Sequence, residues 1–234
     1  MRVRLDISYV GTRYAGWQKQ PGRSTVQRIL EDALGVIYAQ PVIVTGAGRT
    51  DAGVHAAGQV AHFDASKDRP PARDLARILN KILPPDVAIL RAAGVPGAFH
   101  ARKSAVRRTY LYRILTRDNP DTFRAPYVWH APWVRNLSID KMRRAAHGWL
   151  GEKDFSMFAI RVSSVESTQR RMEKIEIRRV RDEIRMTFVA DSFLHRMIRR
   201  MVAVLVDAGA GKSVSQPAYA APAGGLCLQK VAYR

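Results

Sequence analysis

The stretch Gly46-Ala47-Gly48-Arg49-Thr50-Asp51-Ala52-Gly53-Val54-His55-Ala56 lies between two short segments, residues 42–44 and 59–63, whose apolar residues predict strands. Its glycines let the backbone bend tightly and let a ligand approach it closely. The segment therefore presents a carboxylate, Asp51, on a loop. On physical grounds alone, an aspartate in such a loop more often hydrogen-bonds its own turn than carries chemistry. The spacing is neither that of a Walker loop nor that of a dinucleotide-binding loop.

The residues around this loop alternate between strand and helix patterns. Apolar and polar residues alternate over residues 2–9, which predicts a half-buried strand. Capping-box spacing at Ser24 and apolar residues at helical intervals predict a helix over residues 24–37. A second helix over residues 75–82 should stop before Pro84-Pro85, and residues 87–92 follow as a strand. The first part of the chain thus has the order βαββαβ.

The second part of the chain repeats this order. A strand over residues 109–115 precedes a helix capped at Ser138 and extending to residue 150. Residues 175–177 and 184–188 predict a hairpin that turns near Arg181-Asp182, and an apolar stripe over residues 194–205 predicts a helix ended by Gly209. A last strand covers residues 226–233. The expected fold is α+β, with two ferredoxin-like units, residues 1–100 and 101–234, sharing a mostly antiparallel sheet covered by helices. A functional cleft is expected between the two halves.

The charge of the chain points to a polyanionic partner. It carries 39 Lys and Arg against 20 Asp and Glu, a net charge of +19. Residues 1–100 hold 13 basic and 8 acidic side chains, whereas residues 101–234 hold 26 and 12. So large an imbalance favours nucleic acid as the partner, bound mostly by the second part of the chain.

Other classes of protein are disfavoured. The first residues lack the continuous apolar stretch of a secretory signal, so the mature chain is expected to begin here. The apolar run over residues 201–206 is far too short to cross a bilayer. A single cysteine, Cys227, excludes an internal disulfide and fits a reducing cytosol, and the six histidines have no ligand-like spacing. No metal site, no membrane span and a cytoplasmic location are expected.

Two basic segments could contact RNA. Residues 102–117 contain no acidic residue, and two tyrosines, Tyr110 and Tyr112, stand among their six basic residues: Arg102, Lys103, Arg107, Arg108, Arg113 and Arg117. Arginines can bind phosphates while an aromatic ring stacks on an unpaired base. The alternative is that both tyrosines are core residues of a strand, and this reading suits Tyr112 best.

The second basic segment belongs to the helix expected after residue 193. Arg196, Arg199 and Arg200 fall opposite its apolar stripe, where a solvated face would explain most of them. An arginine is also what a catalytic aspartate needs, because an adjacent positive charge keeps the carboxylate ionised and orients it.

Several motifs give the chain a resemblance to the tRNA pseudouridine synthase A family along nearly its whole length. Gly48-Arg49-Thr50-Asp51-Ala52-Gly53-Val54-His55-Ala56, followed by Gln59-Val60 and His62-Phe63, resembles the family signature. The other matching segments, from the opening to the closing one, are Tyr9-Val10-Gly11-Thr12-Arg13-Tyr14-Ala15-Gly16-Trp17-Gln18-Lys19-Gln20, Thr25-Val26-Gln27, Leu30-Glu31, Leu79-Asn80, Leu83-Pro84, Phe99-His100-Ala101-Arg102, Arg108-Thr109-Tyr110-Leu111-Tyr112, Phe193-Leu194-His195, Met197-Ile198-Arg199 and Pro222-Ala223-Gly224-Gly225-Leu226.

The resemblance implies the pseudouridine synthase fold, a homodimer, no cofactor, and isomerisation of uridines 38, 39 and 40 in the anticodon stem-loop of tRNA. It implies that Asp51 is the catalytic nucleophile, that Tyr110 stacks on the target base and that Arg199 pairs with the aspartate. Arg49 matches the arginine beside the catalytic residue, and Arg102, Arg107 and Arg108 are expected to contact RNA. Asp51 could attack C1′ of the ribose or remove the C2′ proton, and the sequence favours neither route.

Two departures from the family pattern concern docking rather than chemistry. The chain is shorter than usual between Gly211 and Pro222, and Ala203 stands where the family commonly has glycine.

Two rival functions stay open. One is a non-catalytic RNA-binding protein, which would not depend on Asp51. The other is a metal-dependent nuclease or phosphotransferase, which would need clustered carboxylates and be silenced by EDTA.

Overall fold

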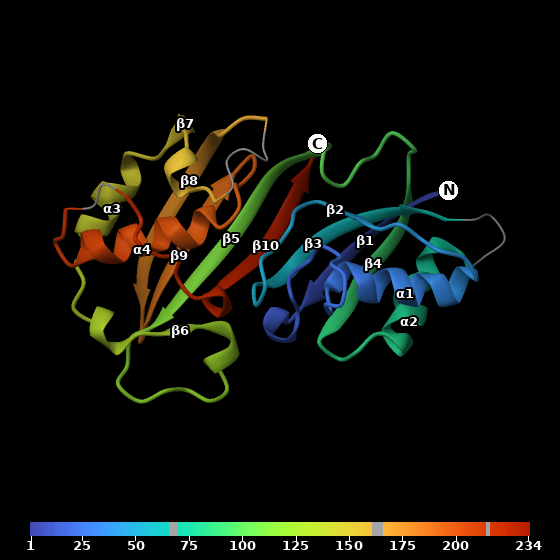
Figure 1. Cartoon of the computed structure of the whole chain (residues 1–234), viewed down its shortest axis with the longest axis horizontal. Helices are drawn as coiled ribbons and strands as arrows, with labels where there is room; N and C mark the ends of the chain where they lie inside the picture. Colours follow the sequence, from blue (N-terminus) through green and yellow to red (C-terminus); the bar gives the residue numbers. More distant parts are fainter. Residues whose placement is uncertain (66–69, 161–165, 214–215) are drawn as a thin grey trace. The chain divides into compact units, whose positions relative to one another are not determined.

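The computed structural model describes residues 1–65, 70–160, 166–213 and 216–234, which include four α-helices (Figure 1). The chain forms two compact units. Unit 1 comprises Met1–Val106 and Leu228–Arg234, and unit 2 comprises Arg107–Cys227. Among the described residues, none of the helices combines the length and the apolar content that crossing a bilayer requires.

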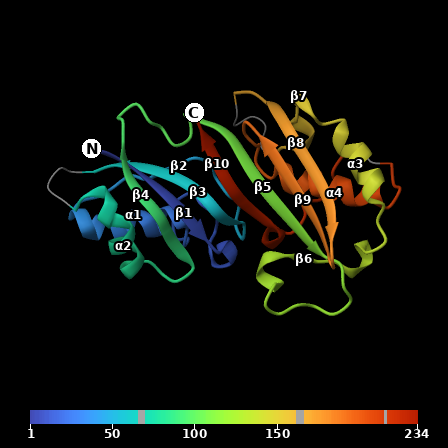
Figure 2. The same ribbon diagram turned by 180° about the vertical axis from the view of Figure 1, so that it is seen from behind.

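Unit 1 confirms the predicted βαββαβ order. Its elements are β1 Arg2–Tyr9, α1 Val26–Tyr38, β2 Thr45–Gly46, β3 His55–Asp64, α2 Ala72–Ile82 and β4 Val87–Val95. Strand β1 pairs antiparallel with β4 on one side and β3 on the other, and β2 pairs with β3. Helices α1 and α2 cover one face of these strands, as the two opposite views show (Figures 1 and 2). The apolar side chains of β1 are fully buried beneath them: Val3, Leu5 and Ile7.

Unit 2 contains the predicted strand, helix, hairpin and helix, together with short elements that the sequence pattern missed. Its strands are β5 Ala105–Leu115, β6 Trp129–His130, β7 Gly151–Asp154, β8 Gln169–Val180 and β9 Glu183–Ala190, and its helices are α3 Ile139–His147 and α4 Met197–Gly209. The strand order is β5-β9-β8-β7, with β6 parallel to the end of β5. Helices α3 and α4 pack together on one face of this sheet (Figure 2).

The last strand groups differently from the predicted division at residue 100. Strand β10, Leu226–Tyr233, forms as predicted, but its residues from Leu228 onward belong to unit 1, where β10 lies beside β3. A Cβ at Gly58 of β3 would lie 2.3 Å from the Gln229 carbonyl oxygen, so the glycine permits this close approach. The Tyr233 hydroxyl also donates to the Ala101 carbonyl. The observed boundary is 106/107 rather than 100/101.

The strand predicted at residues 42–44 is wrong, because the strand is β2, Thr45–Gly46. Burial does alternate along these residues, since Val42 and Val44 are buried and Ile43 is exposed. The backbone of Val44, however, bonds to side chains of α1 instead of a strand. Its N–H donates to Glu31 and its carbonyl accepts from Gln27. Buried polar side chains thus replace a β-ladder.

Two helix starts also differ from their predicted positions. Helix α1 is capped by Thr25, whose side chain accepts from the Arg28 N–H, rather than by Ser24. Helix α4 begins at Met197, after Arg196 in a left-handed conformation (φ 58°), and not at residue 194. The cap predicted at Ser138 is confirmed, since its side chain accepts from the Lys141 N–H, but α3 ends at His147 rather than at residue 150.

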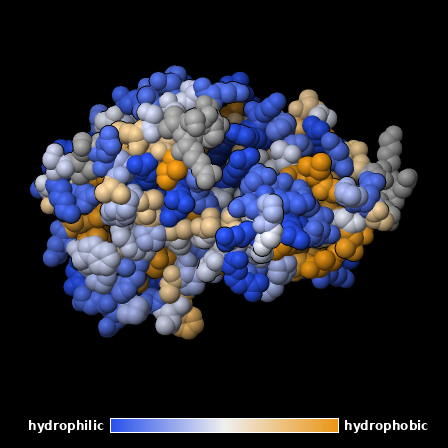
Figure 3. All heavy atoms as spheres, viewed as in Figure 1, coloured by the Kyte–Doolittle hydropathy of each residue, from blue (hydrophilic) through white to orange (hydrophobic). Residues whose placement is uncertain are grey.

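Apolar side chains fill the interior of each unit, and the outer atoms are mostly hydrophilic. In the face shown in Figure 3 the hydrophobic residues form small separate patches. The most exposed large apolar side chains include Val36, Ile43, Phe123 and Trp133. The face shown in Figure 3 is therefore mainly polar.

Candidate functional site

The Asp51 loop of unit 1 joins β2 to β3 and is anchored at several points. The Ala47 N–H donates to the Val60 carbonyl at 2.7 Å, and the side-chain amide of Gln59 donates to the Gly48 carbonyl at 2.8 Å. The Val54 N–H closes a turn by donating to the Asp51 carbonyl at 3.1 Å. Thr50 and Val54 are buried, whereas Asp51 itself is half-buried. The loop is fixed at its flanks and leaves Asp51 partly accessible.

The segment at residues 9–17 holds the loop from its other side. The Tyr9 hydroxyl lies 2.8 Å from the Thr50 hydroxyl, and the Trp17 N–H donates to the Thr50 carbonyl at 3.0 Å. The Gly53 N–H donates to the Tyr14 carbonyl at 3.3 Å. Three contacts thus converge on Thr50 and Gly53, on either side of Asp51, so the segment helps to hold this part of the loop.

Glycines permit this close approach. Gly16 has φ +96°, and a Cβ there would lie 2.6 Å from the Thr50 carbonyl oxygen. A Cβ at Gly11 would lie 2.0 Å from the Val54 carbonyl oxygen, and one at Gly46 would meet the Trp17 ring at 2.5 Å. The sequence pattern gave Gly11 and Gly16 no role. Glycines set among the aromatic residues Tyr9, Tyr14 and Trp17 are the signal that could have identified a backbone contact.

Replacing Gly16 with alanine is expected to lower the free energy of unfolding by about 1–3 kcal/mol, since the new side chain combines an unfavourable φ with a clash against Thr50. Urea unfolding measures this loss of stability. Gly97→Ala is the matched control, because a Cβ there meets nothing within 4 Å. Equal behaviour of the two variants would remove Gly16 from the support of the loop.

Tyr110 of unit 2 lies in the middle of β5 opposite Phe188 of β9. It is 7% exposed, and its ring packs edge to face with the Phe193 ring, with centroids 5.2 Å apart and planes at 83°.

Tyr112, two residues after Tyr110, points to the same face of the strand and is fully buried. Its hydroxyl donates to the Pro222 carbonyl at 2.8 Å, and burial raises its pKa, an effect that the nearby charge of Arg199 partly offsets. The core role considered for Tyr112 is confirmed.

Arg199 lies on α4 in the same unit. Its Nε donates to the Ala221 carbonyl at 2.6 Å, and its own carbonyl accepts from the Ala221 N–H. Residues 221 and 222 therefore link Arg199 to Tyr112, whose neighbour Tyr110 shares the same face of β5. The structure brings Tyr110 and Arg199 to one face of unit 2. Asp51 belongs to unit 1, and its pairing with Arg199 stays a prediction.

The other expected RNA-binding arginines differ in exposure. Arg49 and Arg102 are exposed. Arg107 is half exposed and forms an ion pair with Glu173 at 2.6 Å. Arg108 is only 8% exposed, and its guanidinium donates to the Asp191 carbonyl. Arg108 therefore links β5 to the end of β9, which suits it less well to a phosphate contact than the other three.

The remaining arginines of the α4 region do not form a solvated face. Arg200 donates to the carbonyls of Ala159 and Pro217, and Arg196 precedes the helix. His195 also lies before the helix and not on its first turn. Within the described part of the chain, no group of three or more His, Cys, Asp or Glu side chains is arranged to hold a metal ion.

The chain matches the family model described as tRNA pseudouridine synthase over residues 7–102 and 145–224. It is 42% identical over 211 residues to "tRNA pseudouridine synthase A" of Maricaulis maris, covering 90% of this chain and 84% of that protein. A protein of the same name from Bartonella tribocorum is 38% identical and covers 99% of both chains. A solved structure titled "Crystal Structure of a Cbf5-Nop10-Gar1 Complex" aligns with a TM-score of 0.39 and 11% identity over 97% of this chain and 47% of that one.

The family match covers both the Asp51 loop and helix α4, which carries Arg199. Sequence identity of about 40% over nine-tenths of the chain agrees with it. The chain belongs to the tRNA pseudouridine synthase family.

Proposed function

We propose that the protein isomerises uridines to pseudouridine at positions 38, 39 and 40 of the anticodon stem-loop of tRNA. The observation that carries this proposal is the anchored Asp51 loop within the sequence matched by the family model. The net charge of +19 supports RNA as the substrate, because phosphate neutralisation dominates binding to nucleic acids. The names of the relatives are consistent with tRNA as that RNA.

The chemistry explains why a single aspartate can suffice. Uracil must be detached from C1′ of its ribose, turned, and rejoined through C5, so the nucleotide has to leave its stack and be held throughout. In the proposed reaction the Asp51 carboxylate acts on the sugar, either by attacking C1′ or by removing the C2′ proton. The proton lost from C5 is balanced by the one gained at N1. Product and substrate are isomers, so the reaction consumes no oxidant or co-substrate.

Tyr110 and Arg199 complete the proposed machinery. Tyr110 packs against the uracil ring, and its hydroxyl is suited to assist removal of the C5 proton. Arg199 pairs with Asp51 and keeps it ionised. Their common position on one face of unit 2 supports a shared role. The enzyme is further proposed to act as a homodimer in the cytoplasm.

Replacing Arg199 with alanine should reduce turnover more than tRNA affinity, because its proposed partner is the catalytic carboxylate. Single-turnover rates and binding titrations with the same tRNA separate the two quantities. Arg200→Ala is the matched control, since Arg200 is the adjacent residue on α4 and bonds to two backbone carbonyls. Equal losses of turnover and affinity for Arg199→Ala would indicate a phosphate contact instead.

Arg49, Arg102 and Arg107 are the proposed phosphate contacts. Replacing Arg107 with alanine should weaken binding to different tRNAs alike and lower the slope of log Kd against log salt by about 1. Arg108→Ala serves as the comparison. The buried Arg108 guanidinium donates to the Asp191 carbonyl, so this replacement should lower the unfolding midpoint. An unchanged salt slope for Arg107→Ala would remove that residue from the RNA surface.

The test of the proposed function is incubation of the purified protein with an unmodified tRNA transcript in the presence of EDTA. Formation of pseudouridine with an intact RNA chain is the expected result. Tight binding without pseudouridine would indicate a non-catalytic RNA-binding protein. RNA cleavage that stops in EDTA would indicate a metal-dependent nuclease.

A further inference from the structure

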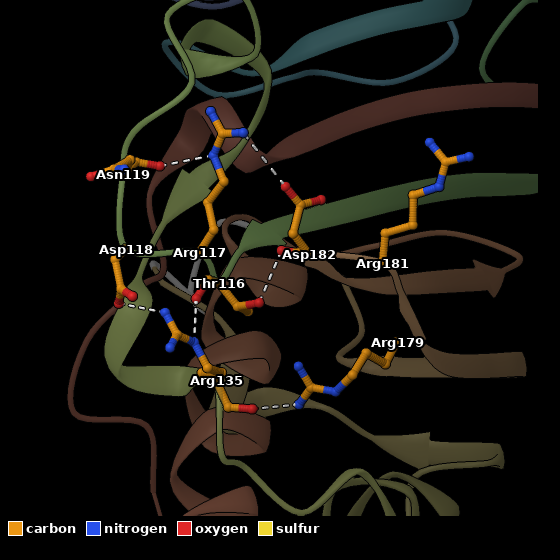
Figure 4. Close-up of a pocket in the computed structure, with 8 residues that line it drawn as sticks. All are labelled: Thr116, Arg117, Asp118, Asn119, Arg135, Arg179, Arg181 and Asp182. Atoms are coloured by element: carbon orange, nitrogen blue, oxygen red, sulfur yellow. Dashed lines mark hydrogen bonds and ion pairs between the residues drawn. The ribbon is translucent and has the colours of Figure 1, made fainter.

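The turn of the β8–β9 hairpin borders a hollow of about 700 Å³ within unit 2 (Figure 4). It is lined by the end of β5 and the residues after it, by Arg135, and by the hairpin turn. Four of its eight residues are arginines and two are aspartates; the eight are Thr116, Arg117, Asp118, Asn119, Arg135, Arg179, Arg181 and Asp182. The hollow shares no residue with the proposed catalytic groups.

The two carboxylates of the lining pair with arginines: Asp182 with Arg124 outside the lining, and Asp118 with Arg135 inside it. Asp182 receives two hydrogen bonds from Arg124, at 2.6 and 3.0 Å, and these help lower its pKa to about 2. Asp118 pairs with Arg135 on the surface and is 78% exposed, so an incoming anion can displace it. The lining therefore retains an excess of positive charge.

The arginines keep donors for a ligand. Arg135 donates to the Thr116 carbonyl, and Arg179 donates once, to the Arg135 carbonyl. Arg181 is exposed, and its guanidinium forms no hydrogen bond or ion pair with any residue that the structure describes. A guanidinium has five N–H donors arranged to match phosphate oxygens, so each of these three side chains can still bind one.

The position of Arg181 is unusual for its residue type. It is the first residue of the two-residue turn between β8 and β9 and has φ 53°. Glycine, asparagine and aspartate are the residues that such turns favour. The turn itself is fixed by Thr116, whose N–H and hydroxyl both donate to the Asp182 carbonyl. An arginine held in this conformation on a fixed turn suggests that its side chain is needed there.

The hollow is distant from the target nucleoside. Thr116 directly follows β5 and stands six residues after Tyr110, which corresponds to about 20 Å along an extended strand. A phosphate bound there cannot be one of those flanking a base that stacks on Tyr110. It must come from another part of the same RNA.

We propose that this hollow is a second RNA-backbone site, in which Arg135, Arg179 and Arg181 bind a tRNA phosphate outside the anticodon loop. The inference rests on the proposed function, because it assumes tRNA as the ligand. It adds a contact that does not depend on the Asp51 chemistry. Its role is to fix the register of the whole tRNA on unit 2, since phosphate contacts position RNA without reading its sequence.

The test compares two RNAs on three variants. Arg179→Gln and Arg181→Asn, alone and combined, remove the arginines, and asparagine tolerates the left-handed turn. The combined replacement should lower the salt slope of log Kd for full-length tRNA by about 1, and each single replacement should lower it by less. Affinity for an isolated anticodon stem-loop should change much less. Arg178→Ala, on the opposite face of β8 and paired with Glu176, is the control expected to behave like the parent protein.

Two further measurements keep the result interpretable. Arg181→Lys keeps the charge and should retain most of the affinity lost in Arg181→Asn, and unfolding midpoints report whether any variant has misfolded. Equal weakening for the stem-loop and the full-length tRNA, or a salt slope unchanged by both replacements, would overturn the proposal. Binding does not require turnover, so these results stand even if no pseudouridine forms.

Discussion

Replacing Asp51 with asparagine is expected to lower the rate of pseudouridine formation by about 10⁴-fold or more, the scale of loss when a catalytic nucleophile is removed. Asparagine keeps the size of the side chain but has neither the negative charge nor the basicity needed at C1′ or C2′. The loop should stay in place, because Ala47, Thr50, Gly53 and Val54 anchor it through backbone groups and the Thr50 hydroxyl. Single-turnover assays measure the rate, and binding titrations measure the affinity for tRNA.

The matched control is Asp32→Asn, a carboxylate in unit 1 that lies on the exposed side of α1 and pairs only loosely with Arg28, at 3.7 Å. It carries the same change of charge and should retain nearly full activity. Substantial turnover by Asp51→Asn would contradict the mechanism. Loss of tRNA binding in parallel with activity would indicate that the carboxylate supports the loop rather than the reaction.

Replacing Glu183 with glutamine is expected to have the largest effect on stability, about 3 kcal/mol at neutral pH. Glu183 is 1% exposed at the start of β9, and its carboxylate accepts from three arginines: Arg113, Arg124 and Arg185. Burial alone would raise its pKa, but the hydrogen bonds from Arg113 and Arg185 outweigh burial and lower it to about 2. Glutamine leaves three guanidinium groups without their common anion.

The pH dependence of this difference has a defined sign. The folded-state pKa lies below the ordinary value of 4.5, so the carboxylate stabilises the fold fully above about pH 4.5. That contribution is lost progressively as the pH falls toward about 2. The free energies of unfolding of the parent and Glu183→Gln proteins, measured with urea, should therefore differ fully at pH 5 and converge as the pH falls from about 4.5 toward about 2. Glu176→Gln should change the free energy of unfolding little at any pH, because Glu176 forms only exposed ion pairs on β8, with Lys174 and Arg178. A pH-independent difference would show that lost packing, not charge, causes the effect.

The hydrophobic pattern was sufficient to predict the main elements of both units. Strand β1 alternates strictly, and helix α2 ends where Pro84 prevents its continuation, so local rules and tertiary structure agree. The hairpin turn at Arg181-Asp182 was also predicted. The pattern failed at Val44 because buried side chains of α1 satisfy its backbone, which no local rule reveals. It failed at the end of the chain because strand pairing, not sequence order, decides which unit holds β10.

The candidate site was only partly accessible to sequence reasoning. The glycine-rich loop identified Asp51 as a carboxylate on a turn, and the resemblance alone supplied a role for it. The support by Tyr9, Gly16 and Trp17 depends on distances between segments more than 30 residues apart. The burial of Arg108 was equally invisible, because the adjacent Arg107 is an exposed arginine of the same basic segment. Charge patterning thus located a basic region without distinguishing structural arginines from those that can reach RNA.

The proposed function is tested most directly by treating a tRNA transcript that contains no pseudouridine with the purified protein and mapping the modified positions. Pseudouridine is expected at uridines 38, 39 and 40 and at no other position, with none formed by Asp51→Asn. Pseudouridine elsewhere in the tRNA, or its absence after prolonged incubation with a tightly bound substrate, would contradict it.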